Sequence, residues 1–384
     1  MQRRRKAFAI LAVPLALIIT IVAGYDHLRG TAFLVQAGDI GGPIRAIAEW
    51  QSDDVAESGV QIPWRGGALN GRTYVASDAD DPPVLLVPGV HAGGIDEPRL
   101  VQFARDVASM GRTVVTAELP DLKTYRITTR STDMIEDAAL WLSSDSGHAP
   151  DGRIGMMGIS FAGGLSIVAG SRPSLRERVA FVLSFGGHGD LPRTLQYLCT
   201  GVMPGGATRP PHDYGVAIIL LGVAGRMVPP EQAGPLEAAI LAFLHASHVD
   251  VLDEAEGQRE FARAKGLAEA LDEPARTLMN YVNARDVARL GPLLLPHVAE
   301  FGGHEALSPS RAPAPPFPVY LLHGLDDNVI PAAESALLAE TLRARGADVW
   351  RVATPMITHA EVDRAAGPQS VWMLVRFWAN LLSE

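Results

Sequence analysis

Short apolar runs alternate along this chain with stretches whose apolar residues recur every three or four positions. Alternation of apolar and polar residues predicts a strand at 72–76, and the short runs predict strands at 82–88, 113–117, 153–158 and 179–185. Helical periodicity separates these runs, as in the stretch from Asp96 to Gly111. Because alternating strands and helices are typical of βαβ units, we expect an α/β fold with a mostly parallel, doubly wound sheet.

The pattern changes after residue 190. Residues 191–310 read as a series of helices, and strand patterns return only at 319–324 and 347–353. Since an unstructured loop of this length is unusual inside a compact domain, we expect residues 191–310 to form a helical cap insertion. The core is then divided into residues 61–190 and 311–384. Residues 26–60 are expected to be a connector with a short helix ending near Trp50.

The N-terminus combines a basic cluster with an apolar segment. Arg3, Arg4, Arg5 and Lys6 precede an uninterrupted apolar run over 7–24, which is close to the ~20 residues that span a bilayer. Basic residues favour the cytoplasmic side, so residues 1–25 predict a single-pass membrane anchor with the remaining chain extracytoplasmic. The alternative is a cleaved signal peptide and a secreted protein, since small residues at 22–24 offer a cleavage site.

Composition narrows the choice of partners and cofactors. The 384 residues are 47% hydrophobic and carry a formal net charge of -10, with no dense basic stripe beyond residue 6, so nucleic acid is not an expected partner. Cys199 is the single cysteine, which excludes an internal disulfide and a cysteine-based metal cluster. Histidine pairs at 245/248 and 297/304 are interpreted as helix faces, so we predict no metal and no cofactor.

A serine stands between small residues at the end of one predicted strand. Gly158-Ile159-Ser160-Phe161-Ala162 fits the nucleophile-elbow pattern, in which a sharp strand-to-helix turn presents a serine hydroxyl. Residues two positions before and after the serine must be small because they approach the backbone closely. The positive end of the following helix dipole stabilises negative charge beside the hydroxyl. Ser160 is therefore the candidate nucleophile.

A serine nucleophile needs a base that is oriented by an acid, and on this fold the acid and then the histidine follow the serine in the chain. The segment 323–331 follows a predicted strand and supplies Asp326 and Asp327, and His359 is the one histidine after it. Asp190, after the strand at 179–185, is a second candidate for the acid.

The oxyanion hole is expected from two backbone N–H groups. Phe161 supplies one, and Val90, just after the predicted strand at 82–88, supplies the other. If residues 91–94 act as a histidine–glycine motif, the second donor shifts to Ala92. His91, His188 and Asp326 are expected to line the substrate pocket. Trp372, Phe377 and Trp378 are expected in the core.

Three segments, PGVH with IDEPRL (88–100), GISFAGG (158–164) and HGLDDNVIP (323–331), give the chain a family resemblance. The sequence resembles the α/β-hydrolase superfamily, in particular uncharacterised bacterial α/β-fold hydrolases, over roughly residues 60–384. The resemblance implies Ser160 as nucleophile, His359 as base and Asp327 as acid, because the HGxxDxxVP spacing reaches Asp327. Ala162 in place of glycine and Pro88 in place of histidine depart from the family pattern, and no glycine precedes His359.

These residues lead to an expected function. We expect a serine hydrolase that cleaves an ester or related acyl substrate through an acyl-enzyme, without a cofactor. The partner is then a small acyl molecule, and membrane anchoring would suit a lipid-like one. Two alternatives stay open: an acyltransferase that uses the same triad, and a non-catalytic binding protein on the same fold.

Overall fold

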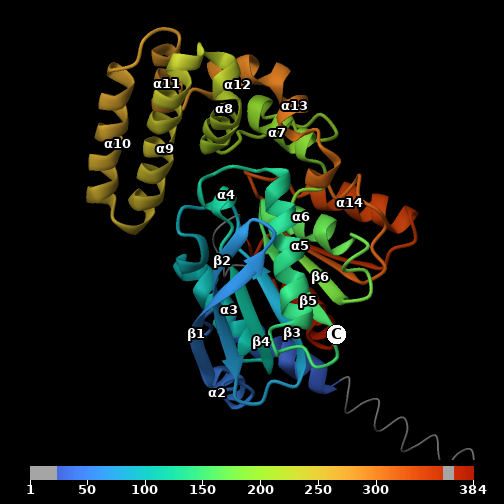
Figure 1. Cartoon of the computed structure of the whole chain (residues 1–384). Coiled ribbons are helices and arrows are strands. Elements are labelled where there is room, and N and C mark those ends of the chain that lie inside the picture. The colour runs from blue at the N-terminus through green and yellow to red at the C-terminus, as the bar shows by residue number, and fades with distance from the viewer. Residues whose placement is uncertain (1–23, 358–366) are drawn as a thin grey trace, which may run out of the picture.

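A computed structural model describes residues 24–357 and 367–384. Its centre is one eight-stranded sheet in the order β1-β2-β4-β3-β5-β6-β7-β8 (Figure 1). The strands are β1 (Val55–Trp64), β2 (Gly67–Ala76), β3 (Asp81–Val87), β4 (Arg112–Ala117), β5 (Ile154–Ile159), β6 (Val179–Phe185), β7 (Val319–Gly324) and β8 (Val349–Thr354).

Strands β3 to β8 pair in parallel, and β1 and β2 form an antiparallel hairpin at one edge. All six residues of β4 and the first five of β5 are buried, as the unbroken apolar runs predicted. The predicted fold class, a mostly parallel doubly wound α/β sheet with a helical insertion between β6 and β7, is confirmed.

Helices cover both faces of the sheet. The helix at 24–37, α3 (Pro98–Ala108) and α15 (Pro368–Leu382) contribute buried side chains to one hydrophobic core. On the other face, α5 (Thr129–Ser144), α6 (Phe161–Gly170) and α14 (Ala333–Ala344) pack into a second core that continues into the cap.

The expected connector at 26–60 is largely part of the folded domain, which differs from the prediction. Phe33 in the helix at 24–37 is buried and packs against Trp378 with a ring-centroid distance of 4.1 Å. α2 (Pro43–Trp50) ends where the short helix was expected, and β1 then joins the sheet. The predicted membrane segment lies almost entirely within residues 1–23, which are outside the described residues.

The cap is mainly helical, apart from a loop at 201–213, and lies over the upper end of the sheet in Figure 1. Its helices are α7 (Leu191–Thr200), α8 (Tyr214–Met227), α9 (Pro230–Leu252), α10 (Glu254–Glu269), α11 (Ala275–Asn283), α12 (Val287–Leu294) and α13 (Val298–Gly302). Among the described residues, α9 alone is long and apolar enough to cross a membrane. Leu236, Ile240 and Phe243 of α9 are buried in the cap, so we interpret α9 as a core helix of this unit.

Candidate active site

Ser160 occupies the turn between β5 and α6. Its backbone has φ 54° and ψ -132°, a left-handed conformation that is strained for a residue with a side chain. The Ser160 N–H donates to the carbonyl oxygen of Phe185 at 2.7 Å, which ties the turn to the end of β6. The serine is 8% exposed and stands at the N-terminus of α6, where the helix dipole favours negative charge.

Small residues are required around this turn. A Cβ placed on Gly158 would meet the carbonyl oxygen of Ala162 and lie 2.7 Å from the Cα of Gly163. A Cβ on Gly163 would meet the Ser184 hydroxyl. Ala162 is fully buried in the core on this face, so its methyl group is accommodated where the family pattern has glycine. The glycines therefore allow α6 to start directly beside β5 and β6.

Asp327 lies in the loop after β7 and points into the protein. Its Oδ1 accepts hydrogen bonds from the N–H groups of Val329 (2.8 Å) and Ile330 (2.9 Å), and the residue is 1% exposed. The neighbouring Asp326 has a side chain that is 75% exposed and pairs with Arg209 at 3.2 Å. The Asp326 carboxylate is therefore exposed to solvent, whereas the Asp327 carboxylate is buried in the loop after β7.

The end of β6 lies between Ser160 and Asp327. Phe185 accepts the Ser160 N–H, and a Cβ placed on the next residue, Gly186, would lie 3.6 Å from Asp327 Oδ2. This proximity follows from the strand order, in which β6 separates β5 from β7. The structure therefore brings the predicted nucleophile and the predicted acid to the same edge of the sheet, where the carboxyl ends of parallel strands meet.

The expected base follows the next strand in the sheet. β8 pairs with β7 and ends at Thr354, whose carbonyl oxygen accepts the N–H of Leu325 at 3.0 Å. The β8 loop therefore starts beside the loop that carries Asp327. His359, five positions beyond Thr354 in the sequence, lies outside the described residues.

The turn after β3 adjoins the serine. A Cβ on Gly89 would lie 3.2 Å from Ser160 Cβ and 3.2 Å from the carbonyl oxygen of Ile159. Val90 follows directly and is half-buried against the core. Among the described residues, no backbone carbonyl accepts the N–H of Val90 or of Phe161. Both expected oxyanion donors therefore sit on segments that flank Ser160.

His91 lies at the interface between the sheet domain and the cap. Its ring meets the ring of His248 on α9 edge to face at 4.6 Å, and its Nδ1 accepts the N–H of Gly93 at 3.2 Å. Burial, reinforced by the neighbouring His248, lowers the pKa of His91 to about 4. His91 is therefore neutral at physiological pH and contacts the cap.

His188 differs from its expected place in a substrate pocket. The ring is fully buried, and its Nε2 lies 2.7 Å from the carbonyl oxygen of Leu307. A Cβ on Gly164 would lie 2.5 Å from His188 Cε1, so the imidazole packs directly under α6. Two glycines allow this close packing after β6: Gly186 has φ 64°, and a Cβ on Gly187 would meet the Ser184 hydroxyl. Burial lowers the pKa of His188 and favours the neutral ring.

Two partners of the Asp327 loop were not predicted from the sequence. His323 in β7 is fully buried, and its Nε2 lies 3.4 Å from Asp327 Oδ2 and 2.7 Å from the carbonyl oxygen of Ile330. The sequence feature that could have predicted this contact is the position of His323 four residues before Asp327. The cap supplies the second contact, since Arg209 Nη1 donates to the carbonyl oxygens of Leu325 (3.0 Å) and Asp327 (3.2 Å).

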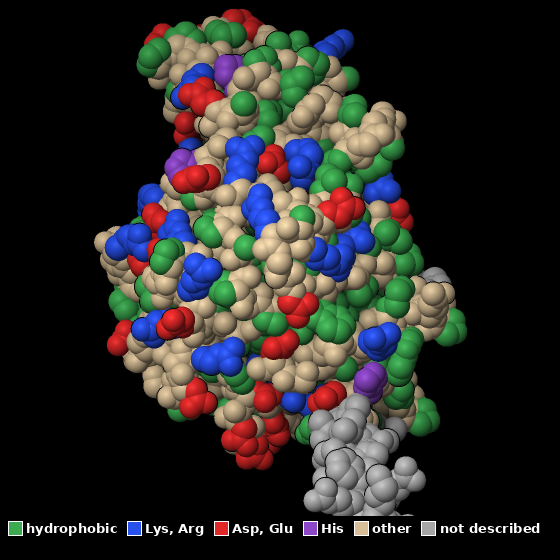
Figure 2. All heavy atoms as spheres, turned by 90° about the vertical axis from the view of Figure 1, so that its right-hand side faces the viewer, with side chains coloured by type: hydrophobic (Ala, Val, Ile, Leu, Met, Phe, Trp, Pro, Cys, Tyr) green, Lys and Arg blue, Asp and Glu red, His purple; other side chains and the backbone are tan. Residues whose placement is uncertain are grey.

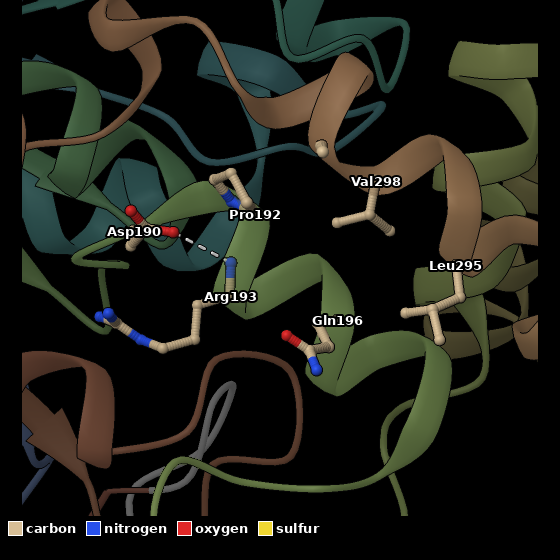
Figure 3. A pocket seen from close by; sticks show the side chains of 7 residues that line it. Asp190, Pro192, Arg193, Gln196, Leu295 and Val298 are labelled. Atoms are coloured by element: carbon tan, nitrogen blue, oxygen red, sulfur yellow. Dashed lines mark hydrogen bonds between the residues drawn. The ribbon is translucent and has the colours of Figure 1, made fainter.

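Asp190 is excluded as the acid because its carboxylate is engaged at the start of the cap. It caps α7, where Oδ1 accepts the Arg193 N–H at 3.1 Å (Figure 3). Its carboxylate also pairs with Arg311 at 3.0 Å. A cavity of about 480 Å³ there is lined by Asp190 and by Gln196 and Val298 of α7 and α13, and Ser160 does not line it. No three metal-ligating side chains come together within the described part of the chain.

Comparisons with known proteins give structural relatives only. No protein-family model and no curated protein matches the sequence. The chain is similar to a Pyrobaculum calidifontis esterase at 15% identity and a TM-score of 0.49, covering 95% of this chain and 92% of the esterase. A Pyrococcus horikoshii acylaminoacyl peptidase has 13% identity and a TM-score of 0.49, and the match covers 90% of this chain and 43% of the peptidase. A carboxylesterase from a metagenomic library has 17% identity and a TM-score of 0.45, with coverage of 86% and 90%.

Proposed function

We propose that the chain is a serine hydrolase that cleaves an ester or a related acyl compound. The observation that carries this proposal is the position of Ser160, whose backbone is strained at a strand–helix turn. The end of β6 contacts Ser160 on one side and the buried Asp327 on the other. A strained, nearly buried serine at a helix N-terminus is costly to maintain, and such strain collects at functional sites.

The proposed reaction uses three side chains and two N–H groups. Ser160 Oγ attacks the acyl carbon while His359 takes its proton, and His359 then passes this proton to the leaving group. Asp327 holds the imidazole in the tautomer that accepts the serine proton. The N–H groups of Phe161 and Val90 stabilise the oxyanion, each by about 2.7–4 kcal/mol. Water finally attacks the acyl-enzyme and releases the acid.

The test is a series of p-nitrophenyl esters, from acetate to laurate, with the wild type and Ser160→Ala. We expect turnover that Ser160→Ala abolishes, with the preferred chain length reporting the acyl group. Added alcohol acceptors separate hydrolysis from acyl transfer, because transfer yields a new ester. Robust turnover by Ser160→Ala would overturn the proposal, and a folded wild type without turnover would favour a binding protein.

We also propose that the apolar run over 7–24 anchors the chain in a membrane. Tyr25 and Trp372 are 52% and 54% exposed, and Trp372 stacks on His27 at 5.3 Å, so exposed aromatic rings surround the first described residues. Tyrosine and tryptophan favour the membrane–water interface. The start of the described chain lies at the end of the domain opposite the cap (Figure 1), so the catalytic edge would face away from the bilayer.

The membrane proposal is tested on the full chain expressed in bacteria. We expect the protein in the membrane fraction, released by detergent and retained in high salt, with an intact N-terminus by mass spectrometry. A soluble exported protein that starts near residue 25 would overturn the anchor in favour of signal-peptide cleavage.

Basic and acidic side chains are interspersed on the face in Figure 2, which supports the expectation that this face does not bind nucleic acid.

A further inference from the structure

The side chain of Tyr125 lies between segments that are distant in the sequence. Tyr125 lies in the loop between the short helix α4 (Pro120–Lys123) and α5 and is 8% exposed. Its hydroxyl donates to the carbonyl oxygen of Leu244 on the cap helix α9 at 3.1 Å. Burial raises the pKa of Tyr125 to about 12, and the backbone of nearby Ala92, two residues after Val90, opposes this rise. Tyr125 thus lies where the α4–α5 loop, the cap and the turn that adjoins Ser160 meet.

The loop holds Tyr125 in a constrained position. Its φ of 59° is in the left-handed region, which is unfavourable for a tyrosine and persists only where the surroundings enforce it. The Arg126 N–H donates to the carbonyl oxygen of Asp121 at 2.7 Å, and the Thr128 hydroxyl donates to the Asp121 carboxylate. These bonds close a tight turn around Tyr125, so its ring has little freedom to follow a moving partner.

The same turn that Tyr125 contacts carries the expected oxyanion donor. Gly89 packs against Ser160, Val90 follows, and Ala92 lies near the phenol. A second contact at this interface, between His91 and His248, also joins the turn to α9.

We infer that Tyr125 is a positioning residue that fixes the 89–92 turn for oxyanion stabilisation while α9 is seated on it. This inference rests on the proposed serine hydrolase activity. Removing the hydroxyl takes a hydrogen-bond donor from the Leu244 carbonyl on α9. Because α9 also contacts the turn through His248 and His91, this loss favours a shift of the turn. Because the oxyanion forms only in the transition state, the shift lowers kcat and leaves KM nearly unchanged.

The experiment compares Tyr125→Phe with Tyr320→Phe in the full chain. Tyr320 is a matched control, since it is also buried and its hydroxyl donates a hydrogen bond to Glu384 Oε1 at 2.7 Å, near the opposite end of the sheet. We expect Tyr125→Phe to lower kcat about 10- to 100-fold, as expected for a misplaced catalytic group, and to weaken a trifluoromethyl ketone transition-state analogue in proportion. Tyr320→Phe should change only the melting temperature.

Two outcomes would overturn the inference, and they are distinguishable. If the wild type shows Ser160-dependent turnover and both tyrosine variants keep the wild-type kcat and analogue affinity, Tyr125 does not position the turn. The same conclusion follows if Tyr125→Phe changes only KM or only the melting temperature. If the wild type shows no Ser160-dependent turnover, the proposed function itself fails and the inference fails with it.

Discussion

Gly89 lies against Ser160, so closely that a Cβ on Gly89 would stand 3.2 Å from the serine Cβ. Gly89→Ala should push the turn by a few tenths of an ångström and misplace the Val90 N–H. We expect kcat to fall about 10- to 100-fold while the protein stays folded, because small displacements of catalytic groups strongly lower the rate of reaction. Gly59→Ala is the control, since no atom lies within 4 Å of its added Cβ. Unchanged ester turnover by Gly89→Ala would argue against this turn as part of the oxyanion hole.

Asp327 and Asp326 provide an adjacent pair with opposite expected effects. Asp327→Asn keeps the shape of the buried side chain but removes the charge that stabilises the imidazolium, so kcat should fall about 1,000- to 10,000-fold. Asp326→Asn loses only an exposed ion pair with Arg209 and should stay close to the wild type in activity. Steady-state kinetics of both variants with one ester substrate shows which aspartate is the catalytic acid. A larger loss for Asp326→Asn would reassign the acid.

Asp106 in α3 gives a prediction about pH and stability. Burial raises the pKa of Asp106 to about 6, although Gln102 donates a hydrogen bond to its Oδ1 at 2.8 Å. The stability that goes with the protonated carboxyl is fully present below the unfolded pKa of about 4 and is lost as the pH rises through about 6.

Asp106→Asn should therefore stabilise the protein at a pH of about 8 and lose this advantage at a pH of about 4. Two pKa units correspond to about 3 kcal/mol in the free energy of unfolding. Denaturant unfolding at both pH values measures it. An advantage that is the same at both pH values, or a variant less stable than the wild type at the higher pH, would contradict the raised pKa.

The strands buried on both faces gave the clearest signal in the sequence, although parts of β2 and β8 were also predicted. β3 to β6 appeared as apolar runs because neither face meets water. β1 was missed because it belongs to the edge hairpin, where Ile62 is its one fully buried side chain. Trp372 was expected in the core and is exposed, since periodicity on α15 does not reveal which face meets solvent.

The candidate site was only partly predictable for a related reason. Local spacing located Ser160 and Asp327, because a sharp turn and a loop after a strand depend on neighbouring residues. The role of Tyr125 and the contact between His91 and His248 depend on the cap helix α9, which follows both residues by more than 100 positions. His188 follows a strand end, as a site residue should, yet the chain turns inward there.

The most direct test of the central claim is covalent labelling with a fluorophosphonate, followed by mass spectrometry of the wild type, Ser160→Ala and His359→Ala. Attack on phosphorus requires a serine that is activated by a base, so the probe reports the nucleophile independently of the substrate. We predict one adduct on Ser160 in the wild type, none in Ser160→Ala, and labelling at least about 1,000-fold slower in His359→Ala. An adduct on another residue, or wild-type labelling rates in His359→Ala, would contradict the account.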